Sequence, residues 1–318
     1  MDRINSELAV IRYLRKRFPK KRSEILTSIG DDALVLQNGY VVSTDSFFER
    51  THFDLAYFSF YALGYHTMAA SLSDLAAMCA SPICVLVSLC VSKKIGMKSI
   101  SELYDGFDEV TRKFKCDMAG GDIVKCQTFG MTITVIGQAS KPLLRSGAVP
   151  GNSLYVTNFL GLAEAGRIAL KDKLLATQYP DSIKKHLYPE PRIKEAFSIR
   201  KYATACIDLS DGLSIDAHHI AEESNVKIVI DSEHIPVHPE VGKLCGIKGG
   251  DPTRFILSSG EDFELLFTAS RLPRIPGLKL FRIGRVMKGR GLFLSDEGRL
   301  KRLEPSGYEH LAKGNPKF

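Results

Sequence analysis

The sequence has no tryptophan and no uninterrupted apolar run of about 18 residues, the length that a transmembrane helix requires. Its N-terminus, MDRINSELAV, lacks the charged, apolar and small-residue regions of a secretory signal peptide. The seven cysteines are odd in number, form no CxxC pair and stand mostly in apolar runs such as CVLVSLC. Buried free thiols are typical of a reducing compartment. We therefore expect a cytoplasmic protein with no membrane partner.

The common nucleotide-binding signatures are also missing. The sequence contains no GxxxxGK[ST] P-loop, no GxGxxG after a strand and no protein-kinase HRD or DFG motif. These absences exclude the usual phosphate-binding loops. If the protein binds a nucleotide, other residues must hold the phosphates.

Positive charge is present in excess, with a net charge of +7 and a pI near 8.9. Much of it lies between Arg12 and Arg22, where no aromatic residues alternate with the basic ones and no nucleic-acid recognition motif follows. We interpret this run as the solvated end of a helix and expect no nucleic-acid partner. A positive protein also suits phosphorylated small molecules.

The length of 318 residues predicts two domains, since one domain takes about 150 residues. Hydrophobic content of 44% and charged content of 25% exclude the disordered and fibrous classes. The stretch KPLLRSGAVPGNS (141–153) is rich in Pro, Gly and Ser, so we place the boundary there, with domains at 1–140 and 141–318.

Apolar periodicity predicts helices and strands mixed in both domains, hence an α/β (α+β mixed) fold. The predicted helices are 3–18, 60–79, 98–114, 161–170 and 212–224. The predicted strands are 33–36, 40–44, 84–91, 131–137, 154–157, 204–207, 227–231, 254–258, 264–268 and 281–286.

Carboxylates recur beside Gly, Ser or Thr at the ends of apolar runs. They are Asp31 and Asp32 in SIGDDALVL, Asp45 in VVSTDS, Asp74 in SLSDLAAM, Asp122 in AGGDI, Asp208 and Asp211 in CIDLSDGL, and Glu261 and Asp262 in SSGEDFELLF. Such oxygen-rich sites suit Mg²⁺, which binds carboxylates, waters and phosphate oxygens. Several metal ions could then neutralise a triphosphate in place of a P-loop lysine.

Each of these groups also has a structural interpretation. Asp211 could cap the helix that follows it, GGD could form a plain turn, and His52 could be a surface-loop histidine. Asp74 differs, because an unpaired carboxylate inside an apolar helix is costly. A functional role is therefore favoured at Asp74.

Eight segments in order resemble the thiamine-monophosphate kinase family. They are SIGDDALVL, VSTDSFFERTHF, LSDLAAMCASP, GGD, RSGAVPG, DLSDGL, SGEDFELLFT and GYEH. The resemblance implies the two-domain fold of the aminoimidazole-ribonucleotide synthetase superfamily, with a C-terminal α/β domain and an N-terminal sheet that forms a barrel across a homodimer. It also implies the last step of thiamine diphosphate biosynthesis, in which thiamine monophosphate is phosphorylated directly by ATP with several Mg²⁺ ions.

The same resemblance implies roles for individual residues. The metal ligands would be Asp32, Ser43, Thr44, Asp45, Asp74, Asp122, Asp208 and Asp211. The ATP contacts would be Tyr104, Gly121, Asp122, Arg145 and Ser210, with Arg145 stabilising charge in the transition state and no residue acting as general base. The contacts to thiamine monophosphate would be His52, Glu261 and Tyr308.

The chain departs from the family pattern at four places. GGDIV replaces GGDTT, Ser259 replaces the first Gly of GGED, FFERTHF replaces VEGVHF, and Cys79 replaces a Gly. Selenophosphate synthetase needs an early reactive Cys and the hydrogenase-maturation carbamoyl dehydratase ends in Cys, whereas this sequence has its first Cys at 79 and ends in Phe318. The remaining alternatives are another ATP-dependent member of the superfamily and a binding protein that has lost turnover.

Overall fold

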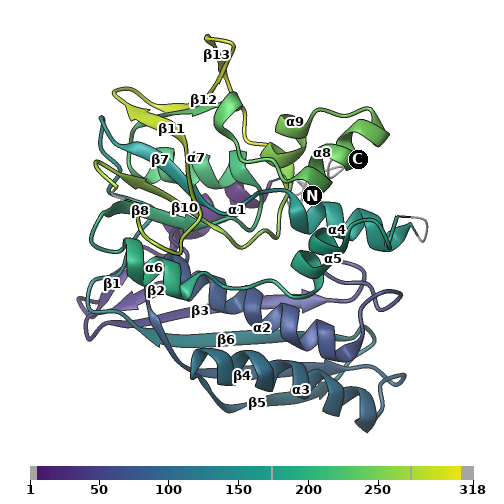
Figure 1. The fold of residues 1–318 in the computed structure, drawn as a ribbon. Helices are drawn as coiled ribbons and strands as arrows, with labels where there is room; N and C mark the ends of the chain where they lie inside the picture. The colour runs from purple at the N-terminus through teal and green to yellow at the C-terminus, as the bar shows by residue number, and fades with distance from the viewer. Residues whose placement is uncertain (1–5, 173–174, 273, 309–318) are drawn as a thin grey trace, which may run out of the picture.

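Two β-sheets, one in each half of the chain, dominate the computed structural model, which describes residues 6–172, 175–272 and 274–308. The first sheet has the order β1-β2-β3-β6-β4-β5 and lies in the lower half of Figure 1. Its strands are β1 (Ile25–Thr27), β2 (Leu34–Leu36), β3 (Tyr40–Phe48), β4 (Ser81–Val91), β5 (Asp117–Lys125) and β6 (Gly130–Gln138). All pairings are antiparallel except that of β4 with β5.

The second sheet has the order β13-β12-β9-β11-β7-β10-β8 and lies in the upper half of Figure 1. Its strands are β7 (Ser153–Thr157), β8 (Ala203–Asp208), β9 (Lys227–Asp231), β10 (Leu265–Ala269), β11 (Leu280–Met287), β12 (Gly291–Asp296) and β13 (Arg299–Arg302). The helices are α1 (Glu7–Arg17), α2 (Phe60–Ala77), α3 (Met97–Phe114), α4 (Leu162–Lys171), α5 (Pro180–Leu187), α6 (Ile193–Ile199), α7 (Leu213–Glu223), α8 (Pro239–Lys248) and α9 (Pro252–Ser258). The mixed α/β fold class is therefore confirmed.

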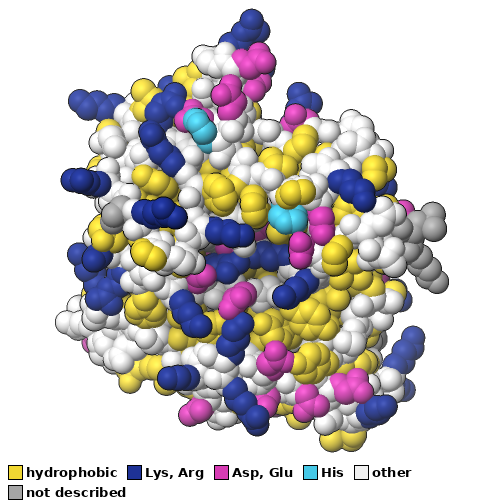
Figure 2. All heavy atoms as spheres, in the orientation of Figure 1, with side chains coloured by type: hydrophobic (Ala, Val, Ile, Leu, Met, Phe, Trp, Pro, Cys, Tyr) yellow, Lys and Arg dark blue, Asp and Glu magenta, His cyan; other side chains and the backbone are white. Residues whose placement is uncertain are grey.

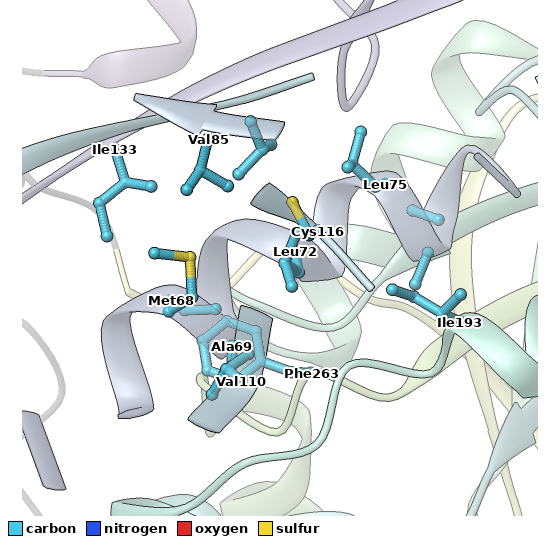
Figure 3. Close-up of a cluster of buried hydrophobic side chains, with 14 of the residues drawn as sticks. Met68, Ala69, Leu72, Leu75, Val85, Val110, Cys116, Ile133, Ile193 and Phe263 are labelled. Carbon is cyan, nitrogen blue, oxygen red and sulfur yellow. The ribbon is translucent and has the colours of Figure 1, made fainter. Parts of the chain in front are cut away.

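Helix α2 is buried along nearly its whole length because its sequence is apolar on every side. Figure 3 shows Met68 and Leu72 of α2 between Val85 and Ile133 of the first sheet on one side and residues of the second half, such as Phe263, on another. Gly64 lets α3 approach α2 closely, since a Cβ there would lie 2.0 Å from the Leu103 carbonyl oxygen. The helix thus joins both halves of the molecule.

Helix α1 precedes the first sheet in sequence but pairs with the second half. Arg12 bonds Glu222 at 2.9 Å and Arg15 bonds Glu223 at 2.5 Å, both at the end of α7. The predicted helix 3–18 corresponds to α1, and residues 3–5 lie outside the described residues. The chain crosses from the first sheet to the second between Gln138 and Ser153, while the exact domain limits stay a prediction.

One prediction about local structure is wrong, and one structural alternative is not supported. The predicted strand at 254–258 is helix α9, because Asp251 accepts the Arg254 N–H at 2.7 Å as N-cap and Pro252 follows at the first helical position. The GGD segment is not a plain turn but part of β5. Glycine is required at 121, because a Cβ there would lie 1.8 Å from the Val87 carbonyl oxygen of β4.

Within the described ranges, no helix is both long and apolar enough to cross a membrane.

Candidate active site

Three carboxylates from distant parts of the chain meet between the two halves. Asp32 precedes β2, Asp74 lies in the last turn of α2, and Asp208 ends β8. One oxygen of each lies within 4.8 Å of those of the other two. Three of the nine carboxylates singled out in the sequence therefore converge.

Hydroxyl groups and one arginine orient these carboxylates. Ser43 Oγ donates to Asp74 Oδ2 at 2.5 Å, and Ser73 Oγ donates to Asp208 Oδ2 at 2.6 Å. Arg145 donates to Asp32 Oδ1 from Nε at 2.9 Å and from Nη2 at 2.6 Å. The fork of Arg145 thus neutralises one member of the cluster.

Burial raises the pKa of all three carboxyls of the cluster, even that of Asp32 beside Arg145, and the pKa of nearby Asp45. Burial raises the pKa of Asp45 to about 6 and, with the nearby charge of Asp32, that of Asp208 to about 7. Burial, followed by the charges of Asp45, Asp208 and Asp32, raises the pKa of Asp74 well above its usual range. A buried oxygen of Asp32, Oδ2, has no hydrogen-bond partner among the described residues. A group of crowded, underneutralised oxygens of this kind fits a hard divalent cation.

A cleft of about 1240 Å³ opens over the cluster. That volume exceeds the range of about 300–1000 Å³ for single-ligand sites, so two substrates can share it. Figure 2 shows basic side chains gathered between the two halves on the face in view. The cleft is lined by most of the sequence-predicted residues, which are Asp32, Ser43, Thr44, Asp45, His52, Asp74, Arg145, Asp208, Ser210, Asp211, Glu261 and Tyr308.

Three predicted ATP contacts do not line this cleft. Tyr104 packs against Phe107 on α3, with ring centroids 5.1 Å apart. Gly121 and Asp122 lie on β5, at the edge of the first sheet, where every residue is exposed. The Asp122 carboxylate accepts the N–H of its neighbour Ile123 at 2.9 Å.

Strand alternation separates Thr44 from its neighbours on β3. Ser43 reaches Asp74 on the α2 side of the sheet, whereas Thr44 Oγ1 lies 3.1 Å from Thr134 Oγ1 of β6. The Thr44 hydroxyl therefore points to the other face of the sheet, away from the three carboxylates.

His52 lies at the cleft wall in the loop after β3. Its Nδ1 accepts the Phe48 N–H at 3.0 Å, and its ring packs edge-on against Phe47 at 5.8 Å. Because Nδ1 acts as an acceptor, the proton is assigned to Nε2. The unusual FFERTHF segment thus helps to orient this histidine, and Arg50 from the same segment also lines the cleft.

Asp211 does not cap the following helix, so that structural alternative is not supported. Helix α7 has Gly212 as its N-cap, without a side-chain cap. The Gly212 N–H instead donates to Asp216, a buried carboxylate inside the helix, at 3.1 Å.

Sequence reasoning missed several cleft residues contributed by α4 and the loop before α2. Arg167 and Glu164 of α4 form a two-pronged ion pair with both bonds at 2.6 Å, and Tyr57 lies near them. The only signal was a Glu-x-x-Arg spacing, which is common on solvated helices.

The sequence is similar to known proteins over most of its length. A family model described as AIR synthase related protein, N-terminal domain, matches residues 30–139. A thiamine-monophosphate kinase of Aquifex aeolicus is 33% identical over 288 residues, which cover 89% of this chain and 92% of the relative. Another, from Buchnera aphidicola subsp. Acyrthosiphon pisum, is 35% identical over 288 residues and 87% of each chain.

Solved structures show the same similarity. One described as "AaThiL complexed with AMPPCP and TMP" has a TM-score of 0.86 and 32% identity, covering 96% of this chain and 97% of that chain. The hydrogenase maturation protein HypE of E. coli has a TM-score of 0.68 at 17% identity, covering 95% of this chain and 99% of that chain. The second likeness concerns the fold alone.

Proposed function

Because this chain belongs to the thiamine-monophosphate kinase family, we propose that it transfers the γ-phosphoryl group of ATP to thiamine monophosphate. The products are thiamine diphosphate, in the last step of its biosynthesis, and ADP. The observation that carries the proposal is the convergence of Asp32, Asp74 and Asp208 at one cleft. The relative with an ATP analogue and TMP bound supports both substrates.

Magnesium fits the carboxylate cluster, since its oxygens are buried, crowded and incompletely neutralised. Asp32, Asp74 and Asp208 would hold Mg²⁺, with Asp45 beside them and Asp211 at the cleft wall. Bound Mg²⁺ would neutralise phosphate oxygens and so favour in-line phosphoryl transfer. Ser43 and Ser73 keep two of the carboxylates oriented.

The protein's own groups contribute positioning and charge. Arg145 lines the cleft beside the cluster, and its fixed positive charge would stabilise phosphate oxygens there. His52 would present Nε2–H to the phosphate of thiamine monophosphate. The attacking phosphate oxygen is already anionic, so no general base is assigned. Ser210 would contact the nucleotide and Tyr308 the thiamine monophosphate, and both line the cleft.

We also propose a homodimer through β5. Its edge is unpaired in the described chain, and Met118, Ile123 and Val124 are exposed along it. Ile123 is 67% exposed where the family pattern has a hydroxyl residue. An uncovered edge of this kind favours pairing with another strand. In such a dimer Gly121 and Asp122 could contact a nucleotide, although they do not line the cleft of their own chain. The role of Tyr104 in ATP binding stays a prediction.

The experiment is a coupled ADP-release assay with thiamine monophosphate and with free thiamine. Only the phosphorylated compound should support turnover, because the acceptor is a phosphate oxygen. Equal rates on both would defeat the proposed substrate. Binding of thiamine monophosphate without ADP release would identify the binding protein that has lost turnover. The cytoplasmic location stays a prediction.

A further inference from the structure

Glu261 has an unusual backbone conformation. Its φ is +63°, and that of Phe263 is +48°, a left-handed conformation that costs a residue with a Cβ about 1–2 kcal/mol. Such conformations persist where the surroundings fix them, and they gather at functional sites. The Glu261 side chain lines the cleft and is 34% exposed.

The residues after Glu261 hold this backbone in place. Asp262 accepts two backbone N–H groups at the start of α4, at 2.5 and 3.1 Å. Glu264 is fully buried and pairs with Lys185 at 2.5 Å and with Arg192 at 2.6 Å. The main chain of the segment is therefore anchored, and the charge of Arg167 favours the ionised Glu261 carboxyl, whose direction a nearby hydrogen-bond donor could set.

His186 is the group placed to do so. It follows Lys185 on α5, and its ring is 1% exposed. Its Nδ1 lies 3.6 Å from Glu261 Oε2, just beyond hydrogen-bond distance. Neither ring nitrogen has a hydrogen-bond partner among the described residues.

The surroundings of His186 keep its ring neutral and in place. Burial, together with His66, Arg167 and Lys171, lowers the pKa of His186 well below its usual value. Its backbone carbonyl lies 2.6 Å from His66 Nδ1, and its ring packs against Tyr57 and Phe58. A neutral ring with its proton on Nδ1 can donate one hydrogen bond toward Glu261.

We propose that His186 is a positioning residue that holds the Glu261 carboxyl for the amino-substituted aromatic ring of the substrate. This inference rests on the proposed function. When the ring enters, the gap from Nδ1 to Oε2 closes to a hydrogen bond, and the second carboxylate oxygen accepts from the exocyclic amine. Burial raises the pKa of Glu261 to about 7, and the ionised form would repel the substrate's phosphate, so Glu261 serves the ring end, beside Tyr57 and Phe263.

A matched pair of variants separates this role from packing. In His186→Asn the amide nitrogen can occupy the position of Nδ1, so the donor is kept while ring volume is lost. In His186→Phe the volume is kept and the donor is lost. We expect the Phe variant to raise the KM for thiamine monophosphate about tenfold or more, with the KM for ATP unchanged. The Asn variant should have a lower Tm but a KM close to that of the wild type.

Val110→Ala is the control, since it removes buried methyl groups from α3 at a position that does not line the cleft. It should lower the Tm and leave the KM for thiamine monophosphate unchanged. The proposal is overturned if the Phe variant keeps the wild-type KM, or if KM follows Tm across all three variants. A wild-type protein that releases no ADP with thiamine monophosphate would instead defeat the proposed function, and ligand binding measured by calorimetry would still test His186.

Discussion

Replacing Asp74 by Asn should make the metal-free protein more stable and yet inactive. Asp74 lies in the carboxylate cluster, and its pKa is raised by burial and by three neighbouring aspartates. The Asn side chain keeps the shape and can still accept the Ser43 hydrogen bond. It removes one charge from a group that Arg145 neutralises only in part.

The size of the effect follows from the separation of the charges. At 4.8 Å, the upper limit of the oxygen separations in the cluster, two unit charges repel by about 3.5 kcal/mol at an effective dielectric constant of about 20. Protonation relieves part of this repulsion, as the raised pKa shows. We therefore expect the free energy of unfolding without metal to rise by about 1–2 kcal/mol, which raises the Tm by a few degrees.

Thermal unfolding with a chelator and with millimolar Mg²⁺, together with ADP release, measures both effects. Wild type should gain stability from Mg²⁺, whereas Asp74→Asn should gain little and should lose nearly all turnover. Asp262→Asn is the control, because this buried carboxylate binds backbone N–H groups of α4 instead. It should lose about 1 kcal/mol under both conditions and keep the Mg²⁺ response. A less stable Asp74→Asn with an intact Mg²⁺ response would show that the carboxylate is only structural.

Three further outcomes are expected. His52→Ala should raise the KM for thiamine monophosphate about ten- to a hundredfold and leave that for ATP nearly unchanged, because one contact to phosphate is lost; steady-state kinetics showing no change in either constant would make His52 a surface residue. Burial lowers the pKa of His66 to about 4, so between about pH 6.5 and pH 4 this imidazole is protonated in the unfolded chain but neutral in the folded chain. Lowering the pH below about 6.5 should therefore reduce the free energy of unfolding more steeply in wild type than in His66→Phe, by up to about 1.4 kcal/mol per pH unit. Urea unfolding across that range measures both slopes, and equal slopes would contradict the prediction. Ile123→Glu should produce monomers in light scattering, with Met97→Glu, an exposed position on α3, as the control that remains dimeric.

The carboxylates of the site could be predicted from sequence because they lie within or at the ends of apolar runs. Asp74 was the most informative, since a charge within the apolar run of α2 has no structural benefit of its own. Asp32 and Asp208 stood at the borders of apolar runs. The local pattern named these residues, but only the structure shows that their oxygens meet.

Features that depend on contacts between distant segments could not be predicted. The two glycines of β5 were also compatible with a turn, because nothing in DMAGGDIVK shows that the main chain of β4 passes beside Gly121. His186 sits in PDSIKKHL, a polar helix whose sequence gives no sign that this ring faces Glu261 from 75 residues away. The short run FIL in α9 fits either a strand or a helix, and the Asp-Pro before it decided the outcome.

The position of α2 has a consequence for how such a chain can be divided. Its side chains pack at once against the first sheet and against residues such as Ile193 and Phe263 of the second half, within one continuous core (Figure 3). Cutting the chain near residue 140 would expose to solvent the apolar side chains of α2 that pack against the second half. The two halves are thus distinct in topology but share the core around α2, so we expect them to unfold together. Exchanging one half between relatives would therefore require the contacts of α2 to be repacked.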